Sequence, residues 1–169
     1  MSIKYIIPLS IILGLSAMFF ASPLFASSNI VDGDLISAED SFDVYIVKII
    51  PSADSGQATK KFKRLILNPD IFNSYEHLKW ENVKSVSESE LNTYTLSELV
   101  LEVNPDGSVA DPKVYKVSSA ADSDTGERRW LDLTTEEFET LGYDWDAIYK
   151  INSTEASPDF YPEGVSITV

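Results

Sequence analysis

Apolar residues occur along the chain in short runs, separated by polar stretches rich in Asp, Ser and Gly. Several runs are rich in β-branched residues or alternate with polar positions, and both patterns are typical of β-strands. The strands predicted in this way cover residues 44–50, 62–67, 83–86, 114–117, 129–133 and 148–151. Polar segments at 52–56 and 121–126 join two pairs of these strands, which predicts two β-hairpins.

A short helix is predicted after each hairpin. Asn68 is a candidate N-cap, because its side chain can accept a hydrogen bond from the backbone, and Pro69 suits the first helical position. Thr134 and Glu137 have the spacing of a capping box. Gly142 follows as a natural end to the second helix.

The predicted elements occur twice in the same order, and individual residues recur with them. Most of the matched positions lie 65–67 residues apart. The matched aromatic residues are Tyr45 with Tyr115, Phe72 with Phe138, Trp80 with Trp145, and Tyr94 with Tyr161. Ordered similarity of this kind indicates an internal repeat.

The repeat predicts an α+β fold made of two tandem β-β-α-β modules. The first would span 43–103 and the second 113–169, each ending in an alternating run, with 27–42 as a lead-in segment and 104–112 as a linker. A unit of about 60 residues buries too little surface to be stable alone. We therefore expect the two modules to pack against each other as one two-lobed body.

The first 26 residues have the pattern of a secretory signal peptide. Lys4 is the only charged residue before Asp32, and a long apolar stretch follows it. Small residues near Ala26 and Ser27 predict cleavage between these two. An uncleaved membrane anchor is the alternative, because residues 6–25 are long enough to span a bilayer. Both interpretations place the remainder outside the cytoplasm, secreted or at the cell surface.

Composition and charge exclude several kinds of chemistry. The chain has 27 Asp and Glu against 13 Lys and Arg, a net charge of −14, which disfavours binding to nucleic acids. It has no cysteine, so it has no disulfide, thiol nucleophile or Cys-ligated zinc, and its single histidine excludes a multi-His metal site. We expect no cofactor, and a membrane contact only through an uncleaved N-terminal segment.

Several strings in both copies resemble a tandem repeat module found in secreted and surface proteins of Candidate Phyla Radiation bacteria. The strings include Val44-Tyr-Ile-Val47, Asn68-Pro-Asp-Ile-Phe72, Gly142-Tyr-Asp-Trp145 and Tyr161-Pro-Glu-Gly164. The resemblance covers nearly all of residues 33–164. It implies this architecture and an extracytoplasmic location, and it supplies no catalytic residue, because no activity is assigned to the module.

Candidate catalytic and metal-binding groups all have simpler explanations. The Asp-rich segment 122–126 has its glycine one place too early for an EF-hand loop, so a hairpin turn explains it better. His77 has no accompanying nucleophile motif. Glu136, Glu137 and Glu139 are the densest carboxylate cluster, and their place at a helix start explains them through the helix dipole.

The recurring aromatic residues are the candidate binding residues. They are Tyr45, Trp80, Tyr94, Tyr115, Trp145 and Tyr161. Such side chains either fill the core of a small domain or, when exposed, stack on sugar rings and protein surfaces, and the sequence leaves both interpretations open. Basic residues gather at 60–64 and 128–129, where they could pair with acids of the other copy or of a second molecule.

These features together predict a non-enzymatic binding or structural module at the cell surface. It would contact an envelope glycan, a surface protein or itself. The alternatives are a small hydrolase that acts on envelope polysaccharide through two carboxylates, and an inhibitor of an extracellular enzyme.

Overall fold

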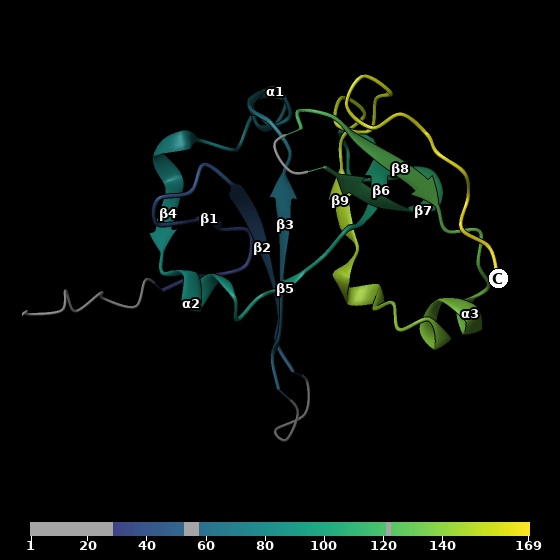
Figure 1. The fold of residues 1–169 in the computed structure, drawn as a ribbon, viewed down its shortest axis with the longest axis horizontal. Helices are drawn as coiled ribbons and strands as arrows, with labels where there is room; N and C mark the ends of the chain where they lie inside the picture. The colour runs from purple at the N-terminus through teal and green to yellow at the C-terminus, as the bar shows by residue number, and fades with distance from the viewer. Residues whose placement is uncertain (1–28, 53–57, 121–122) are drawn as a thin grey trace, which may run out of the picture.

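The computed structural model describes residues 29–52, 58–120 and 123–169, which form a mixed α+β fold with two β-sheets (Figure 1). The predicted signal peptide with its cleavage site at Ala26 and Ser27 lies outside the described residues. So do residues 53–57 of the first predicted hairpin turn and Asp122 of the second. Within the described part, no helix is both long and apolar enough to cross a bilayer.

The first sheet is built from the N-terminal half of the chain. Its strands, in hydrogen-bonded order, are β4 (Val83–Val86), β1 (Leu35–Ala38), β2 (Val44–Ile50), β3 (Lys60–Ile66) and β5 (Thr95–Leu96). β2 is antiparallel to both β1 and β3, whereas β4 runs parallel to β1 and β5 parallel to β3. Helix α1 (Pro69–Asn73) and the 3-10 helix η1 (Trp80–Asn82) connect β3 to β4, and α2 (Glu88–Leu91) leads to β5.

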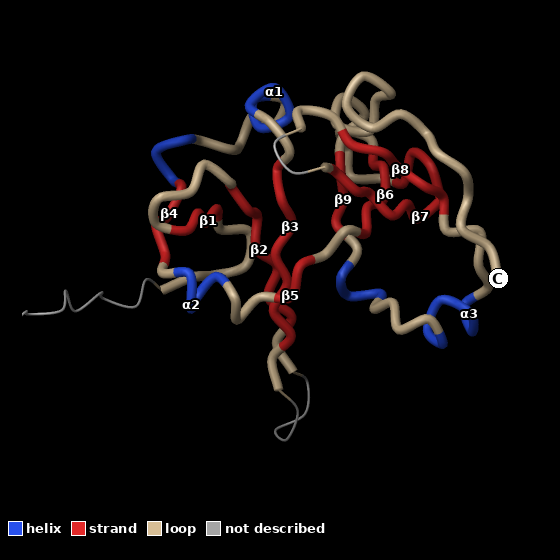
Figure 2. The backbone as a smooth tube through the Cα atoms, in the orientation of Figure 1, coloured by secondary structure: helices blue, strands red, loops and turns tan. Residues whose placement is uncertain are grey.

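The second sheet is built from the C-terminal half. Its strands, in hydrogen-bonded order, are β8 (Gly126–Trp130), β7 (Val109–Ser119), β6 (Leu99–Val103) and β9 (Tyr149–Ile151). β7 is antiparallel to both β6 and β8, and β9 runs parallel to β6. Helix α3 (Thr135–Thr140) and the 3-10 helix η2 (Trp145–Ala147) connect β8 to β9. Figure 2 shows these short helices at the periphery of the strands.

The strands of the two sheets have equivalent neighbours. β1 and β6 each pair antiparallel with the next strand and parallel with a strand that follows an α-helix and a 3-10 helix. β3 is bordered by the parallel strand β5, and β8 is bordered by parallel bridges from Arg128 to Glu163 and from Leu131 to Ile167. The order of elements is therefore the same in both halves as far as β4 and β9, while α2 and β5 of the first half have no helix or named strand as counterparts among the described residues after β9.

The segment 99–103 differs from its predicted place at the end of the first module. It forms β6, which pairs with β7 and β9 of the second sheet. The predicted linker 104–112 contains the tight turn that joins β6 to β7, closed by a 2.8 Å hydrogen bond from Gly107 N–H to the Asn104 carbonyl, and the first residues of β7. The alternating pattern identified a strand, but it did not determine which sheet accepts that strand.

The local helix signals are confirmed. Asn68 caps α1 by accepting a hydrogen bond from Ile71 N–H at 2.9 Å. Thr134 and Glu137 form the reciprocal hydrogen bonds of a capping box at the start of α3. Gly142 follows the end of α3 with a φ of +80°, a conformation that glycine adopts without strain.

The two sheets share one hydrophobic core. Its largest cluster contains Leu35, Val44 and Ile66 from the first sheet together with Val100 and Ile151 from the second. Smaller clusters lie around Phe138 and around Val47. Burial of apolar surface on both sides of this junction stabilises the two halves as one packed body.

Polar groups also join the halves. Arg64 of β3 forms a salt bridge with Glu155, and both side chains are buried. Lys60 Nζ lies 2.8 Å from a carboxylate oxygen of Asp144 and 2.8 Å from one of Asp146. These two basic residues of the segment 60–64 thus pair with acids from the other half of the same chain.

Candidate functional site

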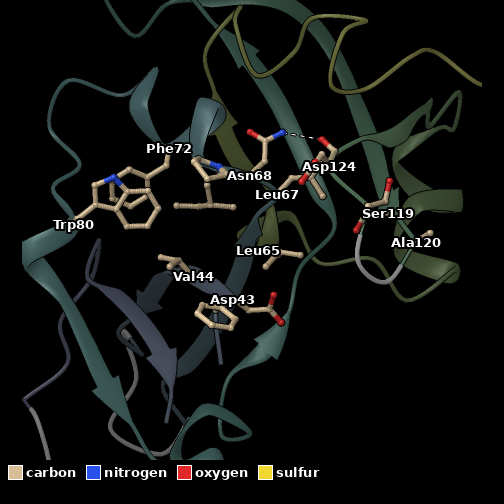
Figure 3. A pocket seen from close by; sticks show the side chains of 14 residues that line it. Asp43, Val44, Leu65, Leu67, Asn68, Phe72, Trp80, Ser119, Ala120 and Asp124 are labelled. Atoms are coloured by element: carbon tan, nitrogen blue, oxygen red, sulfur yellow. Dashed lines mark hydrogen bonds between the residues drawn. The ribbon is translucent and has the colours of Figure 1, made fainter. Parts of the chain in front are cut away.

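A solvent-open hollow lies where β2 begins and β3 ends, beside the turn that joins β7 to β8 (Figure 3). Its volume of about 610 Å³ is in the range of about 300–1,000 Å³ that is typical of small-ligand sites. Val44 and Leu65 line it from the first sheet, and Ser119 lines it from the second. The hollow is therefore shaped by both halves of the chain.

Trp80 forms the aromatic wall of the hollow. Its indole stacks on Phe72 with ring centroids 3.8 Å apart and an interplanar angle of 14°, and its Nε1 donates to Asn73 Oδ1 at 3.3 Å. Phe72 is buried, so one indole face is fixed while 49% of Trp80 stays exposed. Phe42, just before β2, is fully exposed. Two aromatic side chains of the lining are thus open to a ligand.

Polar groups complete the lining. Asn68, besides capping α1, donates from Nδ2 to the Asp124 carbonyl at 2.7 Å and so ties α1 to the β7–β8 turn. Asp43 and Asp124 contribute carboxylates on opposite sides of the hollow, as Figure 3 shows. Within the described part of the chain, neither carboxylate forms a salt bridge.

The free edge of β3 also borders the hollow. β5 pairs with this edge at Phe62 and Lys63 only, and the Lys63 carbonyl accepts a 2.8 Å hydrogen bond from Ser97 N–H. Because the backbone groups of alternate strand residues point to the same side, those of Leu65 also point away from β2. Leu65 also lines the hollow.

Three of the six predicted binding residues are buried in the core. Tyr94, Tyr115 and Tyr161 expose 5%, 3% and 4% of their surface. Tyr45 is partly buried, with its hydroxyl 3.5 Å from Asp43 and the Lys63 ammonium 5.2 Å from its ring centroid. The three buried rings present no surface on which a ligand could stack.

Trp145 has the same local setting as Trp80 but lies elsewhere. It stacks on Phe138 with centroids 3.9 Å apart, its Nε1 donates to Glu139 at 3.2 Å, and 45% of it is exposed. It does not line the hollow. Of the six predicted residues, the structure therefore brings only Trp80 to this site.

Sequence reasoning missed most of the other lining residues. Phe42 carried a usable signal, since it is an aromatic residue between the polar Ser41 and Asp43 in a segment that joins two strands. No such signal marked the polar lining residues Asp43, Asn68 and Asp124, because each resembles an ordinary turn or cap residue in sequence. Only the packing of the two halves brings them together.

The remaining candidate groups are His77, the glutamates at the start of α3 and possible metal ligands. His77 is exposed and lies edge-on to Tyr75, with centroids 5.8 Å apart. Glu137 accepts a hydrogen bond from Thr134 N–H at 2.7 Å, which lowers the pKa of its carboxyl. Among the described residues, no group of three or more His, Cys, Asp and Glu side chains is arranged to hold a metal ion.

Comparison with known proteins assigns no family and no function to the chain. No protein-family model, no curated protein and no solved structure matches the chain. The chemistry of the hollow is therefore the basis for a functional proposal.

Proposed function

We propose that the protein is an exported, non-enzymatic binding module that holds an envelope glycan in the hollow. The signal-peptide pattern of residues 1–26 supports export to the cell surface or the medium. A glycan is the polymer that an envelope protein meets at highest density. It fits the hollow through the apolar face of its sugar rings and through its hydroxyl groups.

We also propose that the module consists of two tandem units, in line with the resemblance to the repeat module of surface proteins. The equivalent strand neighbours support this, as do the matched pairs Phe72–Trp80 and Phe138–Trp145, which have the same stacked geometry. The pairing of β6 favours units of about 35–96 and 99–169, a shift from the boundaries that the sequence suggested.

The observation that carries the proposed function is the exposed ring of Trp80 in a hollow with polar rims. Trp80 is held flat by Phe72, so a sugar ring that stacks on its free face meets a surface that is already ordered. Asn68 lines the hollow as well, and its side-chain amide can bond the hydroxyl groups of such a ligand. Preorganised sites of this kind lose little entropy on binding.

The test compares Trp80→Ala with Trp145→Ala in binding to isolated envelopes and to purified envelope oligosaccharides. We expect Trp80→Ala to weaken binding by more than about tenfold, because the central aromatic contact is lost. Trp145→Ala is the matched control, since it removes an equally exposed and equally stacked tryptophan outside the hollow. Equal loss in both variants, or in neither, would contradict the proposed site.

The hydrolase alternative has one observation in its favour. Asp43 and Asp124 both line the hollow, and glycoside hydrolysis uses a pair of carboxylates that flank the scissile bond. The same incubations decide between binding and hydrolysis when they are also assayed for new reducing ends. Release of reducing ends that disappears in both Asp43→Asn and Asp124→Asn would favour the hydrolase.

A further inference from the structure

We propose that the hollow selects glycans whose sugars carry free, protonated amines. This inference rests on the proposed function, because it names the class of glycan that the same hollow holds. Amino sugars without an N-acetyl group are cationic at mildly acidic pH, where Asp carboxylates are still ionised, whereas their N-acetylated counterparts are neutral and uronic acids are anionic. The hollow distinguishes these three classes by its charge.

The charged groups of the hollow all have the same sign. Asp43 and Asp124 line it, and no Lys, Arg or His does so within the described part of the chain. Neither carboxylate is neutralised by a salt bridge among those residues. The whole chain carries a net charge of −14, so its field also attracts cations and repels anionic glycans.

Trp80 strengthens this preference. The face of a tryptophan ring attracts a cation better than that of any other side chain. Phe72 covers one face of the indole, and the exposed fraction of 49% leaves the other face for a ligand. A sugar that stacks here with a protonated amine gains from both the ring and the carboxylates. A neutral sugar gains from the ring alone.

A cationic peptide shares this charge but fits the hollow less well. An extended peptide would add to the free edge of β3, and strands need at least about three residues. The Lys63 carbonyl already accepts a hydrogen bond from Ser97 N–H, and β3 ends at Ile66. Beyond the part of the edge that is paired with β5, Leu65 is therefore the single residue of β3 whose backbone points outward. Its carbonyl also accepts a long 3.5 Å hydrogen bond from Arg64. The edge is therefore too short for strand addition.

The experiment measures, at mildly acidic pH, the affinity of the full-length chain for three probes of equal length. The probes are a β-1,4-linked glucosamine oligomer, its fully N-acetylated counterpart and oligolysine. We expect the glucosamine oligomer to bind about tenfold more tightly than the N-acetylated one, and this ratio to fall as NaCl rises from about 50 mM to about 500 mM. Asp43→Asn and Asp124→Asn should each reduce this ratio, because each removes one of the two carboxylates that line the hollow.

Asp132→Asn is the matched control for charge. Asp132 is exposed and does not line the hollow, so its substitution changes the net charge by the same amount and should leave the ratio unchanged. Trp80→Ala tests the proposed function separately, because it should weaken both sugars.

Each outcome has a distinct meaning. A ratio near one for the wild type, with both sugars still sensitive to Trp80→Ala, would overturn the amine selectivity and leave the glycan site in place. Tighter binding of oligolysine than of the glucosamine oligomer would overturn both, and so would retention of all binding by Trp80→Ala. A ratio that falls equally in Asp132→Asn would mean that net charge, rather than the hollow, selects the amine.

Discussion

Glu155 is the most deeply buried charged residue that the structure describes, with no exposed surface. Its carboxylate forms a salt bridge with Arg64 and accepts a hydrogen bond from the Tyr75 hydroxyl. Asn152 holds the loop in place, because its Oδ1 accepts from Glu155 N–H at 2.8 Å and its amide donates to Ser74. Three segments distant in sequence therefore meet at one charge pair in the junction of the halves.

We predict that Glu155→Gln strongly destabilises the protein. The substitution leaves the Arg64 guanidinium buried without its counter-ion, and removal of one partner of a buried pair costs about 3–5 kcal/mol. Urea unfolding measures the effect. Glu163→Gln is the control, because the Glu163 pair with Arg128 is long, at 3.9 Å, and half exposed, so we expect a change below about 1 kcal/mol. A similar small change in Glu155→Gln would show that water or a neighbouring group compensates Arg64.

The sequence identified the aromatic residues that recur in both copies but not where each one lies. Trp80 and Tyr94 both recur in the second copy, yet Trp80 is half exposed and Tyr94 is buried. Exposure depends on what packs above a ring, and that is decided by residues far away in the chain. The sequence suggested that Arg64 could pair with an acid of the other copy, but it did not single out Glu155, since no local pattern relates two residues that lie in different halves.

At the scale of elements, the helix caps and the two hairpins were predicted correctly, whereas the neighbours of the strand at 99–103 were not. The caps of α1 and α3 were predicted from a few neighbouring residues, because the hydrogen bonds that form them are local. The strand β6 was predicted as a strand at the end of the first module, whereas it pairs with β7 and β9 of the second sheet, because these partners are chosen by tertiary packing. Amino-acid pattern determines that a segment is extended, and the core determines its neighbours.

The capping box of α3 provides a prediction at this scale. We expect Thr134→Ala to lower the free energy of unfolding by about 0.5–2 kcal/mol, because Glu137 N–H loses its side-chain acceptor at the start of the helix. Thr135→Ala is the control. Thr135 is exposed at the first helical position and does not cap, so its change should lie within about 0.5 kcal/mol. Chemical denaturation compares the two, and equal effects would mean that the Thr134 cap contributes no more to the stability of α3 than an uncapped position does.

At the scale of the whole molecule, the junction between the halves is rich in buried phenols. Burial raises the pKa of Tyr161 to about 12, with a contribution from the nearby Glu155 charge. Burial likewise raises the pKa of Tyr75 and of Tyr149 above the ordinary range. Tyr115, whose hydroxyl donates to Asp111 at 2.9 Å, has its pKa raised to about 12 by burial and by that hydrogen bond. The folded chain therefore keeps these protons at a pH where the unfolded chain releases them.

We therefore predict that alkali destabilises the fold. Unfolded tyrosines ionise near pH 10, so below that value both states are protonated and the stabilising effect is complete. Between about pH 10 and 12 the unfolded chain loses protons that the folded chain keeps, and the free energy of unfolding falls by about 1 kcal/mol per buried tyrosine by about pH 11. Urea unfolding at about pH 8 and 11, with phenolate absorbance recorded in parallel, measures this fall. Tyr161→Phe should make it smaller, because one titrating phenol is removed from the core. Full ionisation of all tyrosines near pH 10 in the folded protein would show that the junction does not exclude water.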